Sequence, residues 1–314
     1  MRTKFFPITM FAIIMGISGL TIVFQKANEI FGIPSIIGTT LLIIDIIIFF
    51  TIFSFYTNKL IRFKDEVKKD FNHPVKINFF ATVSISFLLL SITFEHINKD
   101  ISYYFFIIGT VLQTYFTLNT INFWINKNLE LQHSNPAWFI PIVGNVIVPV
   151  AGASFVSTDF LMYYFALGVF FWIVLTSILI NRIIFHHQLV TKFMPTLFIF
   201  IAPPSLAFIA YLKMNGMQYD MFASALYNLA LFFTFLIFFM YKNFIGLKFF
   251  ISWWAFTFPL TAVAIASMLA YNLTQIVVYK YLSVIFIIVA TLVIITVSIQ
   301  TIKHIIKGEV CVEE

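Results

Sequence analysis

Charged residues are scarce in this sequence. Only 10% of its 314 residues are Asp, Glu, Lys or Arg, whereas 61% are hydrophobic. An average soluble domain is about 25% charged and roughly 45–50% apolar. A water-soluble fold could not bury this much apolar surface. The composition therefore predicts an all-α integral membrane protein, because helices satisfy their own backbone hydrogen bonds in lipid.

Cysteine is scarcer still, and Cys311 is the only one. A single cysteine excludes an intrachain disulfide and a multi-cysteine metal site. We expect neither a metal nor another cofactor. The net charge of +6 does not require a nucleic-acid partner, because most of the basic excess falls in loops on one side of the predicted membrane domain.

Ten apolar stretches are each long enough to cross a bilayer, which takes about 20 residues. They lie near 6–26, 34–57, 76–96, 102–125, 137–157, 159–181, 193–213, 219–241, 249–272 and 279–302. Short loops join them into a single transmembrane domain over residues 1–314. The N-terminus (1–5), the loop 58–75 and the tail 303–314 then share one side with fifteen of the nineteen Lys and Arg residues. The positive-inside rule predicts a multi-pass protein of the plasma membrane with both termini cytoplasmic.

Proline distinguishes the odd-numbered spans from the even-numbered ones. Nine of the ten prolines lie in or at the start of odd spans, and small or hydroxylated residues follow the same alternation. The pattern is carried by Gly16, Ser18, Gly19, Thr82, Ser86, Pro141, Gly144, Pro149, Pro203, Pro204, Ser205 and Pro259. A proline inside a helix removes a backbone hydrogen bond, which is tolerated at membrane depth where protein or a water-filled cavity covers the break.

We therefore expect five helical hairpins around a central pore. The odd helices would be kinked and inner, with the residues named above lining or kinking the pore, and the even helices would be straight and outer. A second interpretation remains open, in which proline and small residues only mediate close helix packing.

The interiors of the odd spans contain no Asp, Glu, Lys, Arg or His. Pumps and proton-driven carriers place such groups at membrane depth, so a proton relay has no parts along this path. Asp45, in the second span, is the one acid deep in any span. It is either a coupling site or a structural hydrogen-bond partner of a neighbouring helix. The spans also hold no carboxylate cluster and no nucleophile beside a base, which argues against an enzyme.

Helix nine carries the sequence Trp-Trp-Ala-Phe-Thr-Phe-Pro-Leu-Thr-Ala over residues 253–262. Three further motifs agree in order and spacing, namely His-Pro-Val-Lys at 73–76, Asn-Pro at 135–136 followed by Pro141, and Ala-Pro-Pro at 202–204. Together they resemble the tellurite-resistance/dicarboxylate transporter (TDT) family, which includes bacterial TehA-like proteins and plant slow-type anion channels. The similarity covers essentially the whole chain.

The resemblance implies ten helices around one pore per subunit in a homotrimer. It also implies that a helix-nine phenylalanine, here Phe258, blocks the pore as a gate. The expected function is an anion channel or passive transporter for chloride, nitrate, sulfite, tellurite-related species or C4-dicarboxylates. The alternative is a proton-coupled C4-dicarboxylate (malate) carrier that uses Asp45.

Overall fold

The computed structural model describes residues 3–186 and 188–312. This part of the chain is helical and contains no strand. Nine of its helices are long and apolar enough to cross a membrane. With η denoting a 3-10 helix, they are η2 (Ile8–Met10) with α1 (Phe11–Phe31), α2 (Ser35–Arg62), η3 (Lys76–Phe80) with α4 (Ala81–Phe94), α5 (Lys99–Asn126), α8 (Thr158–Phe185), η7 (Thr191–Ile201) with α9 (Ala202–Met214), α10 (Met221–Phe239), η9 (Ile251–Phe256) with α11 (Thr257–Thr274), and α12 (Val277–Ile306). The prediction of an all-helical, multi-pass membrane protein is confirmed for these residues.

The fifth expected span, 137–157, is a shorter and interrupted helical run, Pro136–Gly152. It consists of η5 (Pro136–Trp138), α6 (Phe139–Val143), η6 (Gly144–Val146) and α7 (Ile147–Gly152). Proline at 149 cannot donate to the carbonyl of Asn145, so the helical ladder is broken here. Side chains of α5 contact this run one turn earlier, where Gln113 and Thr117 both donate to the Pro141 carbonyl, at 2.9 and 2.7 Å. The arrangement of ten spans in five hairpins therefore stays a prediction.

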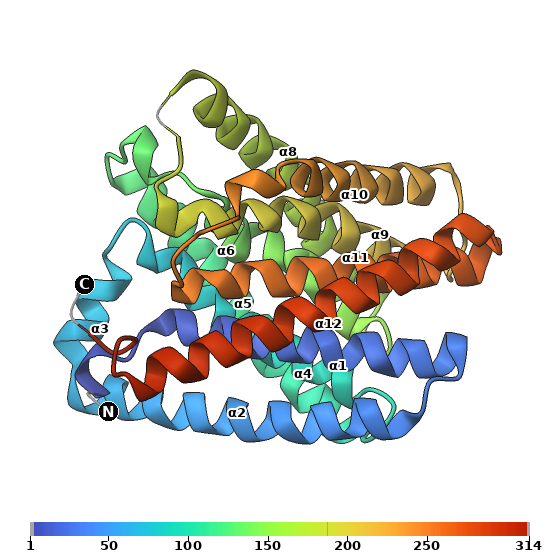
Figure 1. The fold of residues 1–314 in the computed structure, drawn as a ribbon, viewed down its shortest axis with the longest axis horizontal. Helices are drawn as coiled ribbons and strands as arrows, with labels where there is room; N and C mark the ends of the chain where they lie inside the picture. Colours follow the sequence, from blue (N-terminus) through green and yellow to red (C-terminus); the bar gives the residue numbers. More distant parts are fainter. Residues whose placement is uncertain (1–2, 187, 313–314) are drawn as a thin grey trace.

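Five segments form a closed ring. We call them the ring segments, and they are Ile8–Phe31, Lys76–Phe94, Pro136–Gly152, Thr191–Met214 and Ile251–Thr274. Within them α1 packs on α4, α4 on α7, α7 on α9, α9 on α11, and α11 on α1. Each ring segment also packs against the long helix that follows it, which is α2, α5, α8, α10 or α12. Figure 1 shows the long helices running along the longest axis of the molecule.

Burial separates the ring segments from the five covering helices. The most apolar windows of the four long ring segments are 78% to 89% buried, and every residue of Pro136–Gly152 is buried. The corresponding windows of the covering helices are only 28% to 44% buried. The covering helices thus carry most of the exposed apolar surface, as lipid contact requires.

Helix type separates the two sets as well. Each ring segment begins with a 3-10 helix, whereas each covering helix is one continuous α-helix. A 3-10 helix has three residues per turn and seldom exceeds 3–4 residues. At eleven residues, η7 is exceptionally long. It contains Pro195 and leads directly into Pro203 and Pro204 of α9, and these three residues cannot donate a backbone hydrogen bond.

The remaining elements include the short helix α3 (Lys64–Phe71), which follows α2 in the expected cytoplasmic loop 58–75. Lys4 near the start of the chain and Val312 near its end border the same cavity as residues of α3. Both ends of the described chain therefore lie at the same end of the bundle (Figure 1).

Candidate functional site

A cavity of about 600 Å³ lies inside the ring. All five ring segments contribute to its wall, and the wall reaches no farther along them than Met15, Ile85, Ile147, Leu206 and Pro259. Among the described residues of the covering helices, Lys59 at the end of α2 is the single contributor. The cavity is therefore a funnel inside the ring, open at the end where the ring segments begin.

The 3-10 helices determine which side chains face this cavity. Residues three apart stand above one another in a 3-10 helix. In η7 the wall positions Thr196 and Ile199 follow this spacing, and Ala202 continues it into α9. In η9 the wall positions Ser252 and Ala255 do the same, and Phe258 continues the series into α11.

The inner end of the cavity is apolar. The wall residue farthest along is Met15 in α1, Ile85 in α4, Ile147 in α7, Leu206 in α9, and Phe258 with the adjacent Pro259 in α11. Phe258 is the bulkiest of these, and only 7% of it is exposed. A narrow ring of such side chains blocks ions because it cannot replace their hydration shells.

The open end of the cavity is charged. Its lining includes five lysines, Lys4, Lys59, Lys69, Lys76 and Lys192. Among residues 3–186 and 188–312, the lining carboxylates are Glu66 and Asp70, and both lie in α3. The mouth therefore carries an excess of positive charge, which attracts anions.

Both mouth carboxylates are held by lysines. Asp70 accepts from the buried Lys59, with Nζ and Oδ2 2.7 Å apart, and from Lys76 at 3.1 Å. Glu66 lies 3.1 Å from the Nζ of Lys69 and 3.6 Å from that of Lys4. The hydrogen bond from Lys69 and its charge lower the pKa of Glu66. Glu66 therefore stays ionised, and the lysine contacts of both acids fix α3 against the mouth.

Lys192 differs from these lysines. Among the described residues, no carboxylate lies within 4 Å of its Nζ, which instead sits 5.2 Å from the ring centroid of Phe193. Its charge is therefore available to an entering ion.

The predicted site residues divide into two groups. Thr82, Gly144, Pro203, Phe258 and Pro259 lie on the cavity wall. Gly16, Ser18, Gly19, Ser86, Pro141, Pro149, Pro204 and Ser205 are buried but lie off the wall.

Gly16 and Gly19 mark the close approach of α1 to α11. A Cβ on Gly16 would overlap the hydroxyl of Thr257, and one on Gly19 would overlap that of Thr261. The absence of a side chain at these positions therefore lets α11 pack tightly on α1.

Asp45 faces α1 from α2 and does not reach the cavity. The Ser18 hydroxyl donates to its Oδ2 at 2.5 Å, and neither residue is exposed to solvent. Its second oxygen, Oδ1, has no hydrogen-bond partner in the described part of the chain. This geometry joins two helices behind the cavity wall.

Hydroxyl groups on and near the wall mostly serve the backbone. Thr82 donates to the Phe79 carbonyl and Thr196 to the Phe193 carbonyl, three residues back in each case. Thr9 is different, because it lines the cavity and its hydroxyl has no partner among the described residues. Sequence reasoning missed Thr9, and its place two residues after Pro7 is the only signal that pointed to it.

Comparison with known proteins identifies the family. Residues 5–302 match the SLAC1 family, described as voltage-dependent anion channel. The S-type anion channel SLAH2 of Arabidopsis thaliana is 28% identical over 309 residues, which cover 95% of this chain and 59% of SLAH2. The uncharacterized transporter MJ0576 of Methanocaldococcus jannaschii is 26% identical, with 89% of this chain and 87% of that protein covered.

The tellurite resistance protein TehA homolog of Haemophilus influenzae is 24% identical, with coverage of 83% of this chain and 81% of that protein. The chain thus spans little more than half of the plant channel and most of the two microbial proteins. Because the family match covers nearly its whole length, the chain belongs to the SLAC1 family of anion channels and transporters.

Proposed function

We propose that this protein conducts small anions passively through the ring, with Phe258 as the gate. One observation carries the proposal: the cavity has a lysine-rich mouth, uncharged inner walls and an apolar inner end at Phe258. The mouth concentrates anions. The uncharged walls bind them weakly, so that they can leave again. The relatives are named as channels and transporters, which supports transport rather than catalysis.

The proposal includes the finer architecture. Residues 136–152 would cross the membrane as the fifth span in chain order, which brings the number of spans to ten. The ten spans would form five hairpins around one pore in each subunit of a homotrimer. The protein would lie in the plasma membrane with the lysine-rich mouth and both termini in the cytoplasm. The excess of basic residues on that side supports this orientation.

Replacement of the gate tests the conduction path. Phe258→Ala should raise chloride flux through reconstituted protein by roughly tenfold, the change expected if the barrier falls by about 1.4 kcal/mol. The matched control is Phe256→Ala, because Phe256 is in the same ring segment, packs 4.7 Å from the Phe198 ring and does not line the cavity. Flux in vesicles is the measurement. If neither wild type nor Phe258→Ala carries chloride, the proposal fails.

The transported ion requires a separate experiment. Reversal potentials measured with chloride, nitrate, sulfite and malate in turn would rank the candidate anions. A passive channel gives potentials that follow the anion gradient alone. A proton-coupled carrier gives potentials that also shift with pH, and the position of Asp45 outside the cavity does not favour that alternative.

A further inference from the structure

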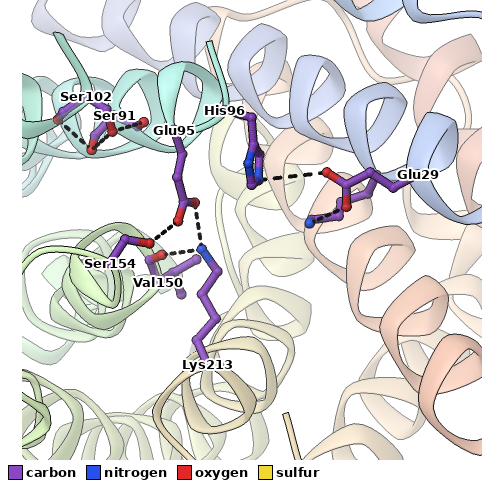
Figure 2. Close-up of polar contacts among 9 residues, drawn as sticks. Glu29, Ser91, Glu95, His96, Ser102, Val150, Ser154 and Lys213 are labelled. Carbon is purple, nitrogen blue, oxygen red and sulfur yellow. Dashed lines mark hydrogen bonds and ion pairs between the residues drawn. The ribbon is translucent and has the colours of Figure 1, made fainter. Parts of the chain in front are cut away.

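A second charged cluster lies at the opposite end of the ring from the cavity mouth. Glu95 directly follows α4, and Lys213 lies in the last turn of α9. The Lys213 Nζ is 2.9 Å from the Glu95 Oε2, and the two side chains are only 20% and 12% exposed. Figure 2 shows them pointing toward each other, with Ser154 and Val150 beside them.

This ion pair joins two ring segments that are not neighbours in the ring. In the ring α7 lies between α4 and α9, so the pair passes beside the end of α7. There Lys213 also donates to the Val150 carbonyl at 2.9 Å, and Ser154 donates to Glu95. Three of the five ring segments are thus tied together where the path would leave the protein.

Lysines do not outnumber carboxylates at this end, unlike at the mouth: Lys26, Lys99, Lys213 and Lys280 face Glu29, Glu95, Asp100, Asp159 and Asp220. Besides the Lys213–Glu95 pair, Lys26 lies 2.6 Å from Glu29, and the His96 ring lies 3.8 Å from Glu29. Burial acts to raise the pKa of Glu95, but the charge of Lys213 and the Ser154 hydrogen bond outweigh it and hold that pKa below its usual range. Glu95 therefore stays ionised at neutral pH, and Lys213 is neutralised by the protein's own carboxylate.

We propose that Lys213 receives the anion at this second end of the path, and that Glu95 is a built-in counter-anion whose ion pair must open for the anion to pass. The proposal rests on the proposed function, since it assumes that anions travel through the ring. The ion pair would close the path electrostatically at its second end, in addition to the apolar gate at Phe258.

The test compares two neutral substitutions in the Phe258→Ala background, where the first closure is already removed. Glu95→Gln keeps a hydrogen-bonding side chain and frees the charge of Lys213, so chloride flux at low ionic strength should rise about fivefold. Lys213→Gln leaves Glu95 uncompensated at the exit, so flux should fall by a similar factor. Lys26→Gln is the matched control, because its partner is on the same helix and the pair does not span the ring. It should leave flux unchanged.

A purely structural role predicts a different result. Both substitutions break the same ion pair, so both should lower the thermal stability of the protein. If the pair had only a structural role, Glu95→Gln and Lys213→Gln would also change the chloride flux in the same direction. Opposite changes in flux with similar changes in stability support the proposal. Changes of the same sign, or no change in either variant, overturn it. If the Phe258→Ala protein carries no chloride, the proposed function itself fails. This outcome can be told apart from failure of the ion-pair proposal, because it is seen before Glu95 or Lys213 is substituted.

Discussion

Phe258 and Asp45 are both buried among apolar helices, but only Phe258 borders the cavity. The motif in helix nine selects Phe258 from 42 phenylalanines, and the 3-10 start of that segment explains why its side chain meets the cavity. Asp45 instead faces Ser18 on the neighbouring helix. Burial therefore has a different meaning for the two residues.

Asp45→Asn should leave anion flux and any pH-driven malate uptake unchanged, since the residue is behind the cavity wall and the Asn side-chain oxygen can still accept the hydrogen bond from the Ser18 hydroxyl. Uptake by reconstituted vesicles under a proton gradient is the measurement. Asp45→Leu, which leaves that hydroxyl buried without its acceptor, should destabilise the protein by about 1–3 kcal/mol. Abolished malate uptake in Asp45→Asn would instead favour the proton-coupled carrier.

The free charge of Lys192 predicts a salt-dependent effect. Lys192→Gln should lower chloride entry from the mouth by about threefold at low ionic strength, and the effect should fade at high salt because screening shortens the reach of the charge. Lys242→Gln is the control, since Lys242 is exposed and does not line the cavity. Equal effects of the two substitutions would show that only overall charge matters. Initial flux rates at several salt concentrations provide the measurement.

Among the elements, α1 and α11 make the closest contact that can be tested by substitution. Gly19→Ala should destabilise the protein by about 1–3 kcal/mol, because its new Cβ overlaps the Thr261 hydroxyl. Adding Thr261→Ala should restore part of the loss. Gly38→Ala in α2 should be tolerated, as its nearest neighbour would be the flexible Gln25 side chain at 3.4 Å. Thermal unfolding in detergent measures all four proteins, and an unchanged Gly19→Ala would contradict the packing described here.

The sequence was sufficient to predict an all-helical, multi-pass membrane protein and the alternation of buried and exposed helices, because these follow from composition and proline placement. It did not predict which face of each ring segment meets the cavity. Side chains recur every 3.6 residues in an α-helix but every three in a 3-10 helix, and the sequence does not show where one changes into the other. Gly16 and Gly19, which we expected near the pore, lie in the α-helical part of their segment and pack against α11. The sequence also did not show which of the basic residues converge on the cavity mouth, because that depends on how the loops and α3 fold back.

For the molecule as a whole, the number of membrane spans can be tested by cysteine labelling, because the chain has a single cysteine to replace. Burial raises the pKa of the Cys311 thiol, and Cys311→Ser removes it altogether. In that background, Gln132→Cys and Thr158→Cys flank residues 136–152 at exposed positions. Ten spans predict that a membrane-impermeant maleimide reaches them from opposite sides. Labelling of both from the same side would mean that 136–152 does not cross the membrane.

The 3-10 helices also set the reach of the ring segments. At 2.0 Å per residue instead of 1.5 Å, the eleven residues of η7 extend about 22 Å rather than about 16 Å. The 24 residues of Thr191–Met214 therefore span about 41 Å, close to the roughly 42 Å of a 28-residue covering α-helix. The longer rise of η7 thus gives this ring segment nearly the length of a covering helix. Winding η7 into an α-helix would shorten the wall by about 5.5 Å and turn its side chains away from their present positions.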